Sequence, residues 1–128
     1  MIIGLNHYNL RASPNVIEEL KIFYENIVGL RVGKRPSFSN GGYWLYAGKK
    51  DVLHLSWSKN GNVNQINTIS TFDHIAFTAT DIEEVKKKLK LNKINFSERE
   101  LPEIGTEQIF FKDPAGNGIE LIFPLEDK

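Results

Sequence analysis

FFKDPAGNGIELIF, residues 110–123, contains two apolar runs separated by a turn. The letters DPAGN suit a turn, because Pro fixes φ while Gly and Asn tolerate positive φ. The flanking runs are rich in residues that favour β-strands. Glu120 lies inside the second run, where a buried carboxylate is costly unless it is paired, hydrogen-bonded or bound to a metal. Glu120 is therefore the first candidate for a functional site.

Composition limits the classes of function open to the chain. It has 128 residues, of which 41% are hydrophobic and 25% charged, as in an ordinary globular domain. The formal net charge is zero, so nothing indicates a nucleic-acid partner. Cysteine is absent, which excludes disulfides, thiolate metal ligands and a cysteine nucleophile. The start MIIGLNHYNL does not resemble a signal peptide and no apolar run could cross a bilayer, so we expect a soluble cytoplasmic protein without a membrane partner.

The chain contains an internal repeat, although the identity between its halves is low. LNHYNLRA resembles FDHIAFTA, and this alignment places His7 over His74. WLYAGKKDVLHL can be laid over FFKDPAGNGIEL, which places His54 over Glu120. The two alignments have almost the same offset along the chain. That agreement indicates a duplicated unit with one polar pair in each copy.

The repeat predicts an α+β fold of two tandem modules within a single domain, residues 1–128. Module one covers residues 1–57, a polar connection covers 58–70, and module two covers 71–128. Each module is predicted to run strand, helix and then three strands. The predicted strands are Ile3–Leu10, Leu30–Phe38, Tyr43–Ala47, Asp51–Trp57, Phe72–Thr78, Ile94–Ser97, Glu107–Lys112 and Gly118–Phe123. The predicted helices begin at Ser13-Pro14, with Gly29 as the stop, and at the capping box Thr80-x-x-Glu83.

Alternation along the predicted strands indicates which side chains share a face. In each of four strands one face is mostly large and apolar, as expected for packing under a helix. Polar side chains gather on the other face. The residues predicted on that face include His7, Asn9, Arg11, His54, His74 and Glu120.

Three imidazoles and one carboxylate form a donor set that suits Zn, Fe, Ni, Co or Mn. The pattern therefore predicts one divalent metal ion with His7, His54, His74 and Glu120 as ligands. A second interpretation stays open at this point. Each histidine could be an ordinary hydrogen-bonded residue, and Glu120 could pair with an arginine or a histidine.

The same segments resemble the vicinal oxygen chelate superfamily, which includes glyoxalases, extradiol dioxygenases, epimerases, and fosfomycin and bleomycin resistance proteins. FFKDPAGNGIELIF is similar to its phrase aromatic-x-DP-x-G-N-x-x-E-aliphatic, and FYENIVGLRVG to its helix-to-strand phrase. LNHYNLRA and FDHIAFTA resemble its two histidine strands, and DVLHLSW resembles its fourth strand. The resemblance covers essentially the whole chain.

The resemblance implies two βαβββ modules whose mixed sheets form a cup, a partly closed barrel with the helices outside, around one divalent ion. The ligands would come from the first and fourth strands of each module, which here carry His7, His54, His74 and Glu120. Glu120 and His54 would also act in catalysis. Members of this length usually form homodimers. Their substrates are small molecules that chelate the metal through adjacent oxygens.

The reaction stays open within this resemblance. Lactoylglutathione lyases usually carry Glu where His54 stands, and a single remaining carboxylate weakens an isomerase assignment. Extradiol dioxygenases and fosfomycin thiol transferases use two histidines and one glutamate, matching His7, His74 and Glu120. The prediction is a metal-dependent lyase, isomerase or dioxygenase. A fosfomycin-type thiol transferase, a metal-free binder similar to bleomycin resistance proteins, and a protein with a structural ion are the alternatives.

Five residues are predicted to contact the substrate. Trp44 and Tyr46 belong to an aromatic cluster that would form either an apolar wall or part of the core. Arg11 and Arg35 are candidate anchors for a carboxylate or a phosphate. Asn9 lies on the same predicted strand face as Arg11.

Overall fold

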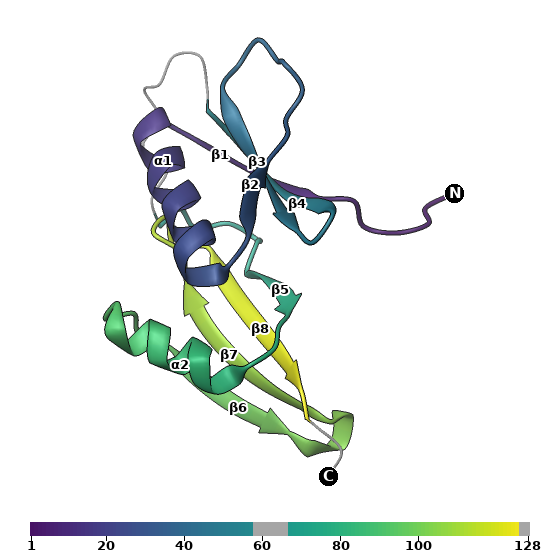
Figure 1. Ribbon diagram of the computed structural model, residues 1–128, viewed down its shortest axis with the longest axis vertical. Coiled ribbons are helices and arrows are strands. Elements are labelled where there is room, and N and C mark those ends of the chain that lie inside the picture. The colour runs from purple at the N-terminus through teal and green to yellow at the C-terminus, as the bar shows by residue number, and fades with distance from the viewer. Residues whose placement is uncertain (58–66, 126–128) are drawn as a thin grey trace. The chain divides into compact units, whose positions relative to one another are not determined.

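The computed structural model describes residues 1–57 and 67–125, which form two compact units, one before Asn67 and one from Asn67 onward (Figure 1). The first unit contains β1 (Tyr8–Ala12), α1 (Pro14–Phe23), the π-helix η1 (Tyr24–Val28), β2 (Arg31–Gly33), β3 (Gly42–Ala47) and β4 (Lys50–Trp57). The second contains β5 (His74–Thr78), α2 (Ile82–Leu91), β6 (Ser97–Leu101), the 3-10 helix η2 (Pro102–Ile104), β7 (Thr106–Lys112) and β8 (Gly118–Pro124). The predicted α+β fold with two tandem βαβββ modules is confirmed. Most of the predicted connection, 58–70, lies outside the described residues.

Each unit holds one mixed four-stranded sheet, with strand orders β1-β4-β3-β2 and β5-β8-β7-β6. The first strand runs parallel to the fourth in each sheet, and the other pairs are antiparallel. These registers place Asn9 opposite His54 and Ala76 opposite Glu120. Among the described strands, hydrogen-bonded pairing stays within each sheet, so the predicted barrel is not closed by a strand ladder.

The first unit buries its helix against the sheet. Val16, Ile17 and Leu20 form the buried stripe of α1, and this helix packs against β4 and β1. Burying each such side chain contributes about 1.5–3 kcal/mol. Gly29 ends the helical segment as predicted, because its φ of 93° lies in the left-handed region that favours glycine. The side chain of Ser13, the predicted cap, makes no capping hydrogen bond.

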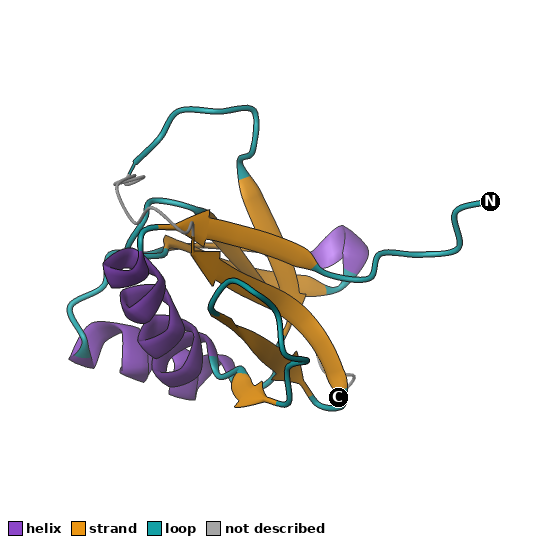
Figure 2. Cartoon of the chain, turned by 90° about the horizontal axis from the view of Figure 1, so that it is seen from above, coloured by secondary structure: helices purple, strands orange, loops and turns teal. Residues whose placement is uncertain are grey.

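The second unit follows the same plan with a less buried helix. Figure 2 draws the helices of both units in purple. Leu89 is the one buried residue of α2, and Lys86 Nζ lies 2.9 Å from Glu98 Oε2 on β6. The helix begins one residue later than the capping box predicted. Asp81, and not Thr80, is its N-cap, and the Asp81 carboxylate accepts a hydrogen bond from the Glu84 amide.

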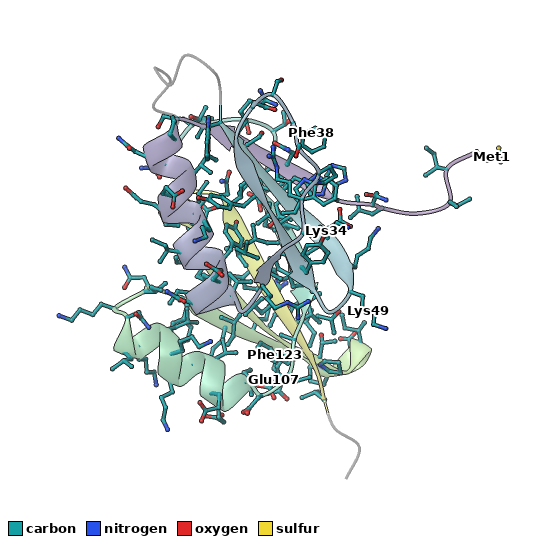
Figure 3. All side chains as sticks on the ribbon, turned by 45° about the horizontal axis from the view of Figure 1, so that its top comes forward. Met1, Lys34, Phe38, Lys49, Glu107 and Phe123 are labelled. Atoms are coloured by element: carbon teal, nitrogen blue, oxygen red, sulfur yellow. The ribbon has the colours of Figure 1, made fainter. Side chains whose placement is uncertain are left out.

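The N-terminal segment before β1 is exposed, and Met1 lies at its far end (Figure 3). The sequence predicted a strand from Ile3, but β1 begins at Tyr8. The ladder between β1 and β4 begins at Tyr8, which pairs with Leu53, although β4 itself begins at Lys50. His7 therefore lies just outside the ladder.

Candidate functional site

Module one brings His7 and His54 together. Their rings stack with centroids 3.7 Å apart and planes inclined by 17°. His54 is buried and lies opposite Trp44, whose ring stacks on it at 4.0 Å and 8°. The His54 imidazole is thus in face-to-face contact with both His7 and Trp44. Desolvation, and then charge repulsion from His54, lowers the pKa of His7 below its ordinary value.

Asp51 is a site residue that the sequence reasoning missed. Its Oδ2 lies 2.7 Å from His54 Nε2, and this hydrogen bond is the main reason why the pKa of Asp51 falls below its ordinary value. Strict alternation would place Asp51 and His54 on opposite faces of β4. A β-bulge changes this arrangement: Leu45 pairs with Leu53, but Tyr46 pairs with Asp51. The extra residue on β4 lets Asp51 reach His54.

The predicted substrate contacts differ in their environments. Trp44 contacts His54, as described above. The Tyr46 hydroxyl donates to the Lys34 carbonyl, and Arg35 Nη2 donates to the Asn40 carbonyl at 3.1 Å. The Arg35 guanidinium also lies 4.8 Å from the centre of the Phe38 ring, in the loop between β2 and β3.

Asn9 and Arg11 lie on β1, next to the His54 strand. Asn9 Oδ1 accepts a hydrogen bond from Ser56 Oγ at 3.0 Å, and Arg11 lies opposite Ser56. Both β1 side chains are exposed. Their positions on one strand follow the predicted alternation.

Module two brings His74 and Glu120 together. His74 Nε2 lies 3.1 Å from Glu120 Oε1. Glu120 is buried, whereas the His74 side chain is 41% exposed, so solvent reaches the histidine side of the pair. His74 Nδ1 lies 2.8 Å from Asp73 Oδ2. Module one has a counterpart to this contact, because His7 Nδ1 lies 2.8 Å from Asn6 Oδ1.

A hydrogen-bonded chain reaches Glu120 from the opposite side. Gln108 Nε2 donates to Glu120 Oε2 at 2.9 Å, and Arg99 Nε donates to Gln108 Oε1 at 2.9 Å. The sequence reasoning missed both residues. The sequence did contain a signal for Gln108. The DPAGN turn sets Phe110 opposite Glu120, and Gln108, two residues before Phe110, lies on the same face of β7.

The DPAGN segment forms the turn between β7 and β8, as the sequence predicted. Asp113 Oδ1 accepts hydrogen bonds from the amides of Ala115 and Asn117, both at 2.9 Å. Gly116 has a φ of 92°, a conformation that favours glycine. The turn thus fixes Phe110 opposite Glu120.

The His74–Glu120 pair fits a metal ion. His74 Nε2 and Glu120 Oε1 lie 3.1 Å apart, and an imidazole nitrogen with a carboxylate oxygen is a donor pair that would hold a divalent transition metal. Carboxylate partners on the outer nitrogen of a ligating histidine are a common feature of metal sites, and Asp73 has that place here. The described residues contain no group of three or more histidines and acidic residues that could hold a metal ion. Each unit holds one pair of the predicted ligands, His7 with His54 in module one and His74 with Glu120 in module two.

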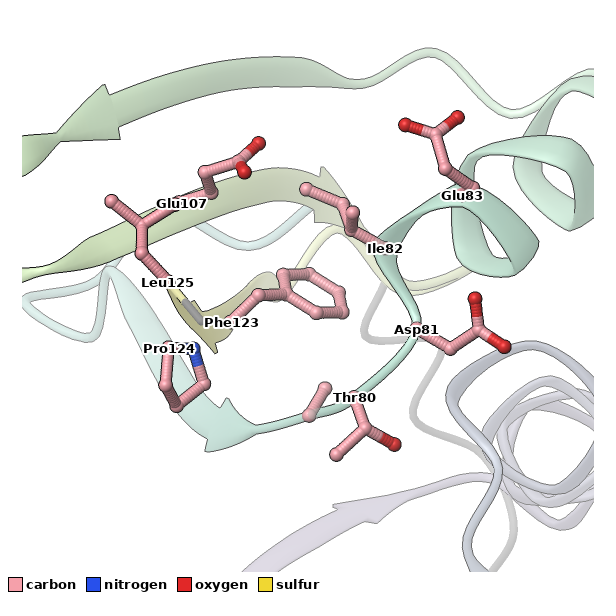
Figure 4. Close-up of a pocket in the computed structure, with 9 residues that line it drawn as sticks. Thr80, Asp81, Ile82, Glu83, Glu107, Phe123, Pro124 and Leu125 are labelled. Carbon is pink, nitrogen blue, oxygen red and sulfur yellow. The ribbon is translucent and has the colours of Figure 1, made fainter. Parts of the chain in front are cut away.

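A separate hollow of about 630 Å³ lies in module two, at the start of α2 and the end of β8 (Figure 4). Its lining includes the acidic residues Asp81, Glu83 and Glu107 and the apolar residues Ile82 and Phe123. None of the predicted site residues lines this hollow.

The comparisons with known proteins bear on the family. The family described as Glyoxalase/Bleomycin resistance protein/Dioxygenase superfamily matches residues 4–121. The chain belongs to this superfamily. The resemblance drawn from the sequence is thereby confirmed. Among curated proteins, none matches the chain.

Several solved structures of the superfamily are similar over nearly the full chain. A protein from Bacillus anthracis described as a glyoxalase family protein is 25% identical with a TM-score of 0.73, covering 97% of each chain. Lactoylglutathione lyase from Agrobacterium tumefaciens is 19% identical with a TM-score of 0.66, covering 94% of this chain and 92% of the other. The fosfomycin resistance protein FosX from Listeria monocytogenes is 21% identical with a TM-score of 0.69, covering 94% and 91%. These likenesses support the superfamily fold.

The described part of the chain contains no helix that is both long and apolar enough to cross a membrane.

Proposed function

We propose that this protein is a divalent-metal-dependent enzyme of the superfamily, acting on a small substrate that chelates the ion through adjacent oxygens. His7, His74 and Glu120 would hold the ion, and His54 would be a fourth ligand or an acid/base group. We further propose that the enzyme works in the cytoplasm as a homodimer. The reaction would be that of a lyase, an isomerase or a dioxygenase.

The His74–Glu120 pair is the observation that carries this proposal. Their facing atoms lie 3.1 Å apart, while Asp73 and Gln108 engage the other polar atom of each side chain. A carboxylate buried in a sheet is retained at a cost, and binding a cation offsets that cost. When bound, the ion would act as a Lewis acid on the substrate oxygens.

Module one supports an acid/base role for His54. The Asp51 carboxylate accepts a hydrogen bond from His54 Nε2, so Nδ1 carries the free lone pair when the His54 ring is neutral. Stacking on Trp44 fixes the plane of the ring. His54 could therefore take up or deliver a proton at Nδ1, with Asp51 holding the required tautomer.

Two alternatives follow from the same fold. A fosfomycin-type thiol transferase would use the same three ligands, and FosX from Listeria monocytogenes has been solved with Mn(II) and sulfate. A metal-free binding protein similar to bleomycin resistance proteins would use the fold without the ligands. The pairing of His74 with Glu120 favours the metal-dependent enzyme over the metal-free binding protein.

The test is metal content by plasma mass spectrometry on protein purified without a histidine tag or chelator. His74→Ala and Glu120→Ala are measured beside the wild type, with Glu103→Ala as an exposed acidic control. We expect close to one ion per chain in the wild type and the control, and loss of the ion in both ligand variants.

The identity of the ion then selects the assays: iron for dioxygenases, nickel or zinc for isomerases, and manganese for thiol transfer. A wild-type protein that holds no ion, and binds none of Fe(II), Ni(II), Zn(II), Co(II) or Mn(II) when they are added, would refute the enzyme proposal and favour a metal-free binder.

A further inference from the structure

We propose that Gln108, oriented by Arg99, is a positioning residue that makes Glu120 bind the metal through Oε1 alone. This inference rests on the proposed function, because it concerns how one of the proposed ligands is presented. Neither Gln108 nor Arg99 would touch the ion or the substrate. Their role would be to act through the carboxylate.

The geometry gives the carboxylate two different ends. Oε2 accepts from Gln108 Nε2 at 2.9 Å, and Oε1 faces His74 Nε2 at 3.1 Å. Gln108 and Glu120 are both buried, with 6% of each residue exposed. A hydrogen bond to an ionised carboxylate is one of the stronger kinds, so it restrains Oε2 toward Gln108.

Arg99 determines which way the Gln108 amide points. An arginine side chain donates hydrogen bonds and accepts none. Because Arg99 Nε contacts one end of the amide at 2.9 Å, that end must be the oxygen, and the NH₂ end must face Glu120. The Arg99 guanidinium also lies 5.3 Å from the centre of the Phe110 ring, which restrains it further.

The amide would thus hold Oε2 toward β7 and leave Oε1 as the oxygen that Glu120 presents to a metal. With one oxygen bound, Glu120 uses a single coordination position, and a chelating substrate can take the positions that remain. Without Gln108, the carboxylate would be free to rotate and to bind with both oxygens. A purely structural role for Gln108 would lower stability when it is replaced, but it would not change how the metal is bound.

The experiment measures Co(II) binding to the full chain by isothermal titration calorimetry and records the visible spectrum of each complex. Gln108→Met keeps the length of the side chain and removes both hydrogen bonds. Its Kd for Co(II) should rise by about 10–100-fold, the usual effect of losing an outer partner of a metal ligand. Its Co(II) absorption bands should shift as the coordination by Glu120 changes.

Arg99 supplies the second, independent pair of variants. Arg99→Met should weaken Co(II) binding less than Gln108→Met does, because the amide remains but can rotate. Arg99→Lys keeps a donor and should recover part of the loss. Ser97→Ala, on the same strand as Arg99, is the control and should leave both the Kd and the spectrum unchanged.

Two failures can be told apart. A folded Gln108→Met with the wild-type Kd and spectrum would overturn this inference and leave the proposed function standing. A wild-type chain with no affinity for any of the five divalent ions would overturn both. If Gln108→Met does not fold, Arg99→Met decides, and wild-type binding by that variant overturns the inference.

Discussion

The two modules place a polar pair at equivalent strands but support it by different means. In module one, His54 is held by flat contacts with His7 and Trp44 and by one carboxylate, Asp51. In module two, Glu120 is held by a chain of directed hydrogen bonds. The repeat therefore keeps the polar pairs at equivalent places in the two modules, while their surroundings differ. Stacked rings restrain the plane of a side chain, whereas a hydrogen bond also determines which of its polar atoms is engaged.

The largest effect should come from a part in which the modules are alike, their cores. Leu53 and Ile119 lie on equivalent strands and are fully buried. Leu53→Ala and Ile119→Ala should each lower the free energy of unfolding by about 2–5 kcal/mol, through lost burial and a residual cavity. Urea unfolding followed by circular dichroism measures this. Leu91→Ala, at an exposed position, should stay within about 0.5 kcal/mol; a much larger loss in one core than in the other would contradict the likeness.

The second-largest effect should come from the hydrogen-bonded chain that distinguishes module two from module one. Glu120→Ala removes the acceptor of the buried Gln108 amide. An unsatisfied buried donor costs about 1–3 kcal/mol, so the unfolding free energy should fall by that amount. Urea unfolding of metal-free protein gives the value, with Glu103→Ala as the exposed control. A variant as stable as the wild type would show that the hydrogen-bonded chain contributes nothing to stability.

A smaller effect is expected from the ring contacts of module one. A double-mutant cycle with Trp44→Leu and His54→Leu isolates the coupling between the two stacked rings. The coupling free energy should be about 0.5–1.5 kcal/mol in favour of the pair. Unfolding free energies of the four proteins provide it. Additive losses, with no coupling, would mean that the stacked arrangement does not stabilise the module.

The smallest effect concerns pH. His54 holds the pKa of Asp51 below its ordinary value of 3.8. A carboxyl group with a lowered folded pKa stabilises the protein above the unfolded pKa and loses that contribution as the pH falls through the folded pKa. The stability advantage of the wild type over Asp51→Asn should therefore be complete at pH 6 and shrink below the ordinary pKa of aspartate. Urea unfolding at pH 6 and pH 3 tests this, and an advantage that is equal at both values would contradict it.

Much of the fold followed from the sequence because its signals are local. Helical spacing located α1, and turn residues located the β7–β8 hairpin. The first strand was predicted too long, since strand propensity at Ile3 does not reveal where the ladder between β1 and β4 begins. The capping box was placed one residue early, because Thr80 and Asp81 are both good N-caps and only the backbone decides between them.

The candidate site was predictable where it depended on alternation alone. Alternation led to His54 and Glu120, which are both buried and each lie within hydrogen-bond distance of a polar partner. Asp51 could not be found that way, because a bulge lies between it and His54. Gln108 required a strand register in addition to a face, since its partner is on a neighbouring strand and not directly opposite.

The bulge beside Val52 makes the chemistry near His54 depend on chain length. A chain lacking this one residue would keep the ladder regular and would turn Asp51 to the other side of the sheet. His54 would then lose its carboxylate with no substitution at either position. A gap of one residue in an alignment of related chains can therefore separate proteins that have this histidine–carboxylate pair from those with the histidine alone.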